Sequence, residues 1–303
     1  MLVGVDQDTL VEDVLATLRW CVRLGAGDQI TVLHATPIYP WMRRGVESDP
    51  EWVASAQAEE GKAERLLSTS ERLLSSWGIS AETVRVEGHA AEAILRVAAE
   101  RQVDLIVVGA LGQEERGFLV GSVSQKVKAL ALTDVLVVRR GAPLQASPLR
   151  ALLAVDGSTH SLAAAEALAT KVRWEGAQVH IVHALDVPML SMWELLAGVE
   201  EVDPASLPPP LRERAGQALS GPLRILHAHG IEATTEIRTG RPAVEILEAA
   251  RRHQAHLIVV GSRGLSGIRG LLLGSVTQRV VRHGTTSVLV ARGPHRADGR
   301  SES

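Results

Sequence analysis

The sequence contains one pattern twice, and this repeat limits the fold to two versions of one domain. The segment from Gly88 to Gly109 aligns without a gap to the segment from Gly240 to Gly261, and both end in Leu-Ile-Val-Val-Gly. The apolar segments that open the two halves also align, Leu2–Asp6 with Leu152–Asp156. Each half is long enough to bury a core of its own, so the 303 residues predict two domains of ordinary size.

Each half alternates between short apolar strands and helical segments. Continuous apolar runs such as Leu257–Val260 indicate strands that are buried on both faces of a sheet. Strands that alternate with helices indicate right-handed parallel crossovers. We therefore predict two tandem α/β domains, each an open five-stranded parallel sheet. The predicted helices cover residues 10–24, 50–77 and 90–101 in the first half, and 161–174, 210–229 and 242–253 in the second.

Local signals agree with these elements. Ser158 is placed to cap the first helix of the second half, and Pro242 suits the first turn of a later helix. Gly88 and Gly240 fit tight turns between a strand and a helix.

The predicted domain boundaries are residues 1–141 for the first domain and 149–293 for the second. The join lies near Gly141–Pro148, where glycine, proline and serine gather. Residues 186–210 contain several prolines and predict a mobile excursion over the second domain. Residues 294–303 predict a flexible tail.

Composition excludes several classes of protein. A formal net charge of -3 with no block of like charge gives no electrostatic reason to expect a nucleic-acid partner. The single cysteine, Cys21, excludes an internal disulfide and fits a reducing compartment. The apolar runs are far shorter than the roughly 20 residues of a membrane span, and no basic leader follows Met1. We therefore expect a cytoplasmic protein without nucleic-acid or membrane partners.

The clearest candidate for a binding site follows the strand that ends at Val260. Gly261 ends this strand, Gly264 lies in the next loop, and Gly274-Ser275 opens an apolar helical stretch. Backbone N–H groups at a helix start lack intrahelical partners and attract anions. The pattern therefore predicts a phosphate site.

A carboxylate is expected beside this loop. The first strand of each half ends at an aspartate, Asp6 or Asp156. Parallel sheets bind ligands outside the carboxyl ends of their strands, so each aspartate lies near its glycine loop if strands one and four are neighbours. The carboxylate is an acceptor for ribose hydroxyls or an adenine edge, and the loop amides suit phosphates. A nucleotide needs both.

On these residues the chain resembles a tandem universal stress protein, with two family domains covering nearly its whole length. Nucleotide-binding members show a Gly-x2-Gly-x9-Gly-Ser/Thr loop, and the second half reproduces that spacing. The resemblance implies a Rossmann-like fold of the adenine-nucleotide α-hydrolase-like kind with sheet order 3-2-1-4-5, and ATP, with or without Mg²⁺, as ligand. The implied binding residues are Ala154, Val155, Asp156, Ala184, Val260, Gly261, Arg263, Gly264, Gly274, Ser275 and Val276.

The first half departs from this family pattern. Only eight residues separate Gly112 from Gly121-Ser122, and Gln113-Glu114-Glu115 adds two carboxylates. Losing one residue moves the amides of a phosphate cradle, and like charge near a polyphosphate is unfavourable. We therefore predict a weaker or empty first site, in which Ser122 serves as a helix N-cap. The corresponding weaker candidates are Asp6, Gly109, Gly112, Gly121 and Ser122.

No catalytic or metal-binding residues are predicted. The chain lacks a Gly-x4-Gly-Lys-Ser/Thr loop and a Gly-x-Ser-x-Gly elbow. His34 and His183, at strand ends, are interpreted as hydrogen-bonded structural residues. His227 and His229 lack a carboxylate or cysteine at ligand spacing, which favours a solvated helix end.

Three functions follow from these observations. The leading one is an ATP-binding stress-response regulator, with its signalling role implied by the family alone. The second is a nucleotide-free interaction module. The third is an enzyme that transfers or hydrolyses a nucleotide, which the absence of a His-x-Gly-His signature near Asp6 or Asp156 disfavours. The resemblance also implies that the two domains pair about a pseudo-two-fold axis through Val135–Val138 and Ser287–Val290, as an internal dimer or a further homodimer with an unknown protein partner.

Overall fold

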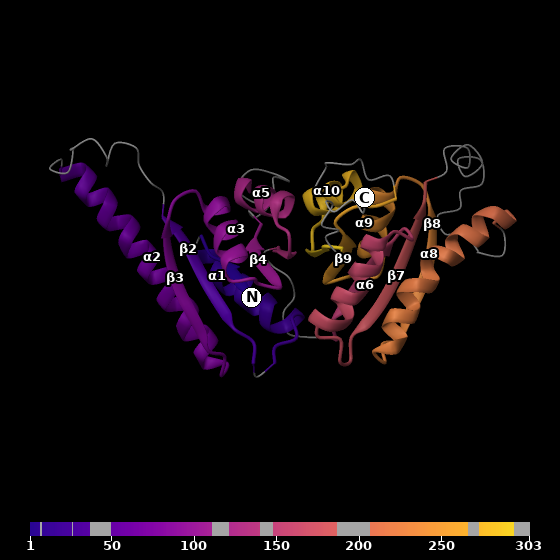
Figure 1. Cartoon of the computed structure of the whole chain (residues 1–303), viewed down its shortest axis with the longest axis horizontal. Helices are drawn as coiled ribbons and strands as arrows, with labels where there is room; N and C mark the ends of the chain where they lie inside the picture. Colours follow the sequence, from indigo (N-terminus) through magenta and orange to yellow (C-terminus); the bar gives the residue numbers. More distant parts are fainter. Residues whose placement is uncertain are drawn as a thin grey trace, which may run out of the picture. The chain divides into compact units, whose positions relative to one another are not determined.

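The computed structural model describes residues 1–6, 8–25, 27–36, 50–110, 121–139, 148–186, 207–265 and 273–293. The chain divides into two compact units, Met1–Ser147 with Thr285–Ser287, and Pro148–Gly284 with Val288–Ser303. We call strands β1–β5 with their helices the first domain, and strands β6–β10 with theirs the second domain (Figure 1). The predictions for Gly112 and for the tail at 294–303 lie outside the described residues, as do almost all of the join and most of the excursion.

The first domain alternates strands and helices as the sequence predicted. Its strands are β1 (Leu2–Gly4), β2 (Ile30–Thr36), β3 (Ala81–Glu87), β4 (Leu105–Gly109) and β5 (Asp134–Val138). Its helices are α1 (Asp8–Cys21), α2 (Pro50–Ser76), α3 (Ala90–Glu100) and α5 (Ser122–Leu130).

The second domain repeats this order. Its strands are β6 (Arg150–Val155), β7 (Gln178–Leu185), β8 (Ala233–Thr239), β9 (Leu257–Gly261) and β10 (Ser287–Ala291). Its helices are α6 (Thr159–Lys171), α8 (Pro209–Ala228), α9 (Pro242–Arg252) and α10 (Ser275–His283).

The strand order confirms the predicted sheet topology. The order is β3-β2-β1-β4-β5 in the first domain and β8-β7-β6-β9-β10 in the second, which is 3-2-1-4-5 in both. The first strand of each domain pairs in parallel with the second and the fourth. The carboxyl ends of the first and fourth strands are therefore neighbours, which is where this topology places ligands.

Helices cover the sheet in layers, and the core lies between them and the strands. In the first domain α1 contacts α2 and α3 contacts α5, and in the second α6 contacts α8 and α9 contacts α10 (Figure 1). Right-handed crossovers in a 3-2-1-4-5 sheet place these two layers on opposite faces. The strand segments Leu105–Val108 and Leu257–Val260 are fully buried, as their unbroken apolar sequence predicted.

The predicted turn and cap residues are also confirmed. Gly88 and Gly240 both have φ +138, a conformation that side chains with a Cβ rarely adopt. The Ser158 hydroxyl accepts a hydrogen bond from Ser161 N at 3.2 Å and caps α6. Pro242 is in the first turn of α9.

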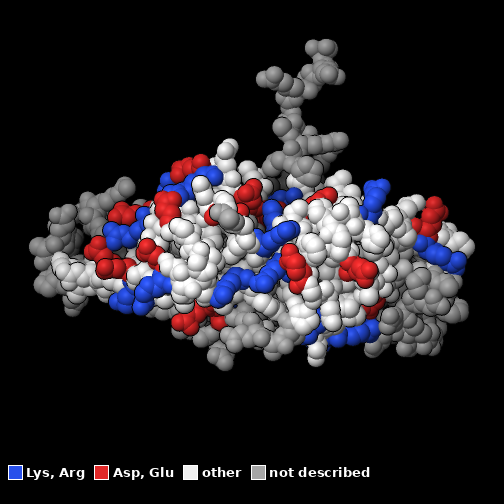
Figure 2. Space-filling view, turned by 90° about the horizontal axis from the view of Figure 1, so that it is seen from below, with Lys and Arg blue, Asp and Glu red and all other residues white. Residues whose placement is uncertain are grey.

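The surface of the described residues carries mixed charge. Figure 2 shows basic and acidic side chains interspersed over both domains, in line with the low net charge of the chain. No helix among the described residues is both long enough and apolar enough to span a bilayer.

Candidate functional site

The second domain brings its first-strand aspartate directly against the glycine-rich loop. Strands β6 and β9 pair with Ala154 opposite Val260, so Asp156 and Gly261 follow at the same edge of the sheet. The Asp156 carboxylate Oδ2 accepts a hydrogen bond from Leu265 N in the loop at 2.9 Å. The two parts of the predicted site are therefore in contact.

The same carboxylate also fixes the turn into α6. Its Oδ1 accepts a hydrogen bond from Ser158 N at 3.0 Å, and Ser158 then caps the helix. Gly157 between them has φ +84, and its Cα faces the backbone of α8, where an added Cβ would lie 3.4 Å from Ala218 Cα. Glycine is favoured here because the conformation is strained for any other residue.

Two glycines of the loop are favoured because another group approaches each of them closely. A Cβ on Gly261 would lie 2.6 Å from the His160 carbonyl oxygen, and one on Gly264 would lie 2.5 Å from Asp156 Oδ2. Gly274 N donates to Ser262 O at 2.7 Å, and the buried Ser262 N donates to Ala291 O at 2.8 Å. These contacts hold the loop against the ends of β9 and β10.

The loop leads into α10, whose start faces the same edge of the sheet. Gly274 is the N-cap of α10 and Ser275 is its first residue. The first N–H groups of a helix have no intrahelical partner and carry a partial positive charge. Thr277 Oγ1 donates to Gly261 O at 2.7 Å and ties this helix start to β9.

The interpretation of Ser122 as an N-cap is wrong. Gly121 caps α5 with non-helical backbone angles (φ -55, ψ 150), and Ser122 is already the first residue of the helix. A side chain in that position cannot reach forward to the N–H groups that an N-cap satisfies. Ser124 Oγ instead donates to Gly121 O at 3.0 Å.

Basic groups lie near the described part of the second-domain loop. The Nε of Arg263 is buried and has no hydrogen-bond partner among the described residues. Burial lowers the pKa of His160, Arg263 and Arg292 lower it further, and Asp156 acts in the opposite direction. Two arginines therefore lie close enough to His160 to act on it electrostatically, and this charge suits an anionic ligand.

The other predicted residues of the second domain lie at the same edge of the sheet. Ala154 and Val155 end β6, Ala184 is next to last on β7, and Val260 is next to last on β9. Val276 is partly exposed in the first turn of α10.

Sequence reasoning missed two residues of this site. His160, four residues after Asp156 on α6, packs its backbone against Gly261 and its ring against Gly293. Leu265 gives its backbone N–H to Asp156 and exposes its side chain. The sequence signal that could have identified His160 as a site residue is its position four residues after Asp156, in the first turn of the following helix.

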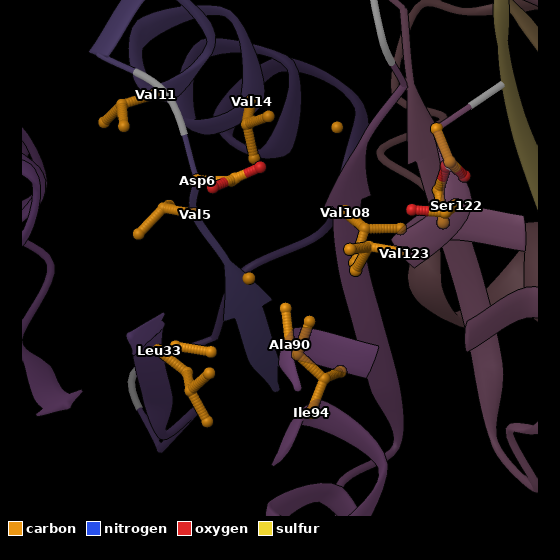
Figure 3. A pocket seen from close by; sticks show the side chains of 15 residues that line it. Val5, Asp6, Val11, Val14, Leu33, Ala90, Ile94, Val108, Ser122 and Val123 are labelled. Atoms are coloured by element: carbon orange, nitrogen blue, oxygen red, sulfur yellow. The ribbon is translucent and has the colours of Figure 1, made fainter. Parts of the chain in front are cut away.

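The first domain holds a cavity at the equivalent place (Figure 3). The space is about 760 Å³, including the part open to solvent, and four of the five first-domain candidates lie in its wall or beside it. The lining residues are Gly4, Val5, Asp6, Val11, Val14, Leu33, Ala35, Ala90, Ile94, Val108, Gly109, Gly121, Ser122, Val123 and Ser124.

Asp6 is placed differently from Asp156. Its side chain is 69% exposed, and the Lys62 ammonium lies 3.9 Å from Oδ1. Among the described residues no hydrogen bond to the Asp6 carboxylate is seen. Figure 3 shows Asp6 at one side of the cavity and Ser122 at the other.

The buried histidines have a structural role. His34 Nδ1 and His183 Nδ1 are each 2.8 Å from the carbonyl oxygen of the residue before the strand-end aspartate, Val5 and Val155. Both rings are almost fully buried in their domains. The described residues contain no group of three or more side chains that could hold a metal ion.

Comparisons with known proteins place the chain in a family. The model of the universal stress protein family matches residues 1–139 and 149–292. A universal stress protein of Mycolicibacterium smegmatis is 28% identical, and the match covers 96% of each chain. A universal stress protein of Methanocaldococcus jannaschii is 32% identical over 47% of this chain and 81% of its own length. The crystal structure of a universal stress protein from Archaeoglobus fulgidus has a TM-score of 0.67 at 22% identity, covering 96% of this chain and 97% of that one.

The chain belongs to the universal stress protein family, a family of stress-response proteins, and contains two of its domains in tandem.

Proposed function

We propose that this protein is a cytoplasmic stress-response regulator that binds ATP in its second domain. The observation that carries the proposal is the contact between Asp156 and the glycine-rich loop, through Leu265 N at 2.9 Å. This contact brings the acceptor for the nucleoside part to the loop that would cradle the phosphates.

The charge of the second site supports a phosphate ligand. Arg263 has a buried Nε without a partner among the described residues, and the free N–H groups of the α10 start follow Gly274. Backbone amides, a helix dipole and a guanidinium together favour bound phosphate. The proposed binding residues are those named for the second half of the sequence, and Mg²⁺ would accompany the phosphates.

The proposed role is regulation and not catalysis. Members of the family are generally non-enzymatic stress-response proteins. A change of shape or of protein partner with nucleotide state would then carry the signal. The pairing of the two domains about a pseudo-two-fold axis and the identity of an outside partner stay predictions.

One observation favours the alternative of a nucleotide-free interaction module. Both oxygens of the Asp156 carboxylate already accept backbone hydrogen bonds, from Ser158 N and Leu265 N. A nucleotide that uses Oδ2 has to share this oxygen with Leu265 N or displace that donor by opening the loop. A loop that never opens would leave the glycines with a packing role alone.

The experiment that separates the two functions is calorimetric titration of ATP with Mg²⁺ into the full chain. We expect about one ATP per chain in the wild type. Gly274→Asp should weaken binding by about 100-fold, because it places a carboxylate beside the phosphates. A Cβ at this position lies 3.4 Å from its nearest neighbour, so the loop can accept the new side chain with a small shift.

Gly216→Asp is the matched control. Gly216 lies exposed in α8, and nothing lies within 4 Å of an added Cβ. The control should bind ATP like the wild type. Absence of ATP binding to the wild type would contradict the proposal and leave the nucleotide-free module.

A further inference from the structure

We propose that ATP binding in the second domain is coupled to protonation of His160, so that the site holds the nucleotide more tightly at mildly acidic pH. This coupling depends on the proposed function, since it concerns the same site. It adds a form of regulation that the binding residues named above do not provide. The evidence is the position of the His160 ring among the charged groups of the site.

The His160 side chain is held between the ends of β9 and β10. His160 lies in the first turn of α6 and is partly buried. A Cβ built on Gly261, the last residue of β9, would lie 2.6 Å from the His160 carbonyl oxygen and 2.9 Å from its Cβ. A Cβ built on Gly293, just after β10, would lie 3.1 Å from the ring Cδ2 and 3.4 Å from Nε2. These contacts fix the ring at the edge of the sheet where the glycine-rich loop begins.

Three charged side chains of the described residues act on this ring, and two of them are cationic. Arg263 belongs to the glycine-rich loop, and its Cα lies 3.4 Å from a Cβ built on the N-cap residue of α10. Arg292 directly precedes Gly293, against which the ring packs. Burial lowers the pKa of His160 most, and Arg263 and Arg292 lower it further. Asp156 raises the pKa and offsets part of this effect. The ring is therefore uncharged at neutral pH when no anion is bound.

A polyphosphate at this site changes the balance of charge around the ring. Its negative charges would lie against the loop amides and Arg263, where they offset the field of the guanidinium. The pKa of His160 then rises on binding, and the ring takes up a proton as ATP enters. Proton binding and ATP binding are reciprocal, so protonation of the ring raises the affinity for ATP by the same factor. The affinity therefore increases as the pH falls from the pKa of the complex toward that of the free protein.

The first domain lacks the residues for this coupling. In the aligned sequences Leu10 takes the place of His160, and Leu111 takes the place of Arg263. Neither leucine can titrate or carry a charge. We therefore expect the coupling in the second domain alone.

The test is calorimetric titration of ATP with Mg²⁺ into the full chain at pH 8 and pH 6, in buffers with different ionisation enthalpies. The dependence of the observed heat on the buffer gives the number of protons taken up. His160→Gln keeps a polar side chain that helices accept well and removes the titrating ring. Because phosphate groups titrate in the same range, both proteins are titrated with the same ligand. The wild type should take up more protons, and its affinity should rise between pH 8 and pH 6 about five- to tenfold more than that of His160→Gln.

His229→Gln, at the exposed end of α8, is the matched control and should keep the proton uptake and the pH profile of the wild type. Equal proton uptake and equal pH profiles in the wild type and His160→Gln would overturn the proposal. Failure of the proposed function has a different signature, since it appears as absence of ATP binding to the wild type at both pH values.

A second measurement requires no substitution and stays informative if His160→Gln fails to fold. The ring signals of histidine-labelled wild-type protein are followed by NMR against pH, with and without saturating ATP and Mg²⁺. One histidine should show a pKa that rises when ATP is added, and its signal should be the one missing from His160→Gln. If ATP raises the pKa of no histidine, the coupling is rejected.

Discussion

The two domains share a sheet order and a strand-end aspartate, yet the two aspartates meet different surroundings. Asp156 is held by two backbone N–H groups and draws the glycine-rich loop toward the sheet. Asp6 is exposed beside a cavity, with a lysine 3.9 Å away. The difference teaches that the two domains share one scaffold, whereas the side chains near the strand ends give equivalent positions different surroundings.

A second difference lies between the third strand and the helix that follows it. In the second domain Arg238 Nη1 donates to Glu236 Oε1 at 2.7 Å and Arg238 Nε donates to Glu245 Oε2 at 2.8 Å. These side chains are 4%, 9% and 15% exposed. The aligned residues of the first domain are Val84, Val86 and Ala93, so an ion network replaces apolar packing.

The largest expected effect comes from breaking this network. Arg238→Ala removes the guanidinium shared by two largely buried carboxylates, of which Glu236 keeps contacts with His253 and Arg252, and should lower the free energy of unfolding of the second domain by about 3 kcal/mol. Chemical denaturation followed by hydrogen exchange of β8 peptides measures this loss. Val86→Ala, the change at the aligned position of the first domain, should have a much smaller effect because that site holds no charge.

Replacing the three side chains that differ from the first domain is a sharper test of the comparison. The triple variant Glu236→Val, Arg238→Val and Glu245→Ala copies the first domain, and its stability should be close to that of the wild type or higher. A triple variant as unstable as Arg238→Ala would show that the domains differ in more than these three side chains.

The next effect concerns the close approach of β9 to α6. Gly261→Ala places a Cβ 2.6 Å from the His160 carbonyl oxygen, and backbone cannot move as freely as a flexible side chain. Overpacking of this kind should destabilise the second domain by about 1–3 kcal/mol and weaken ATP binding. Thermal unfolding and titration of the same sample measure both. Gly216→Ala, in open space on α8, is the control and should leave both values at or above the wild type.

The third prediction compares the aspartates themselves. Asp156→Asn keeps only one side-chain acceptor oxygen for two backbone donors, so the second domain should lose about 1 kcal/mol. The amide of Leu265 should then exchange its hydrogen faster, since its acceptor at 2.9 Å is changed. Asp6→Asn should change stability by less than about 0.5 kcal/mol. Equal effects of the two changes would contradict the contrast between the two sites.

Most of the fold and part of the site could be predicted from the sequence. The apolar runs at 105–108 and 257–260 predicted buried parallel strands, and the predicted helix ends lie within a few residues of those observed. The repeat and the spacing of the second-half glycines predicted the approach of Asp156 to the loop. These features depend on local pattern and on strand order, which the sequence carries directly.

What the sequence did not reveal depends on tertiary contacts. The alternation of Thr234, Glu236 and Arg238 along β8 is typical of a strand face exposed to solvent, and those charges are buried because α9 lies over them. The N-cap at Gly121 was misassigned to Ser122, because serine is the commoner cap and nothing local fixes the first helical residue. His160 belongs to the site through its packing, for which no sequence motif exists.

The smallest expected effect is a dependence of second-domain stability on pH. His180 stacks on His253 with ring centroids 4.0 Å apart, and its Nδ1 lies 2.5 Å from Thr234 Oγ1. Burial lowers the pKa of His180, His253 lowers it further, and Glu236 acts in the opposite direction. Since its pKa in the folded domain is below the value in the unfolded chain, the unfolded chain binds the proton more readily. Stability is therefore fully present above about pH 6.5 and falls as the pH drops toward the folded value.

The first domain supplies the variant that tests this pH dependence. The residue aligned with His180 is Thr31, so His180→Thr removes the titrating ring and keeps a side chain found in the sister domain. Denaturation curves between pH 7 and pH 5 should then show a shallower loss of stability for His180→Thr than for the wild type. His229→Gln, at the exposed end of α8, should leave the slope unchanged. An identical slope in all three proteins would mean that the stacked histidine pair does not make the second domain acid-sensitive.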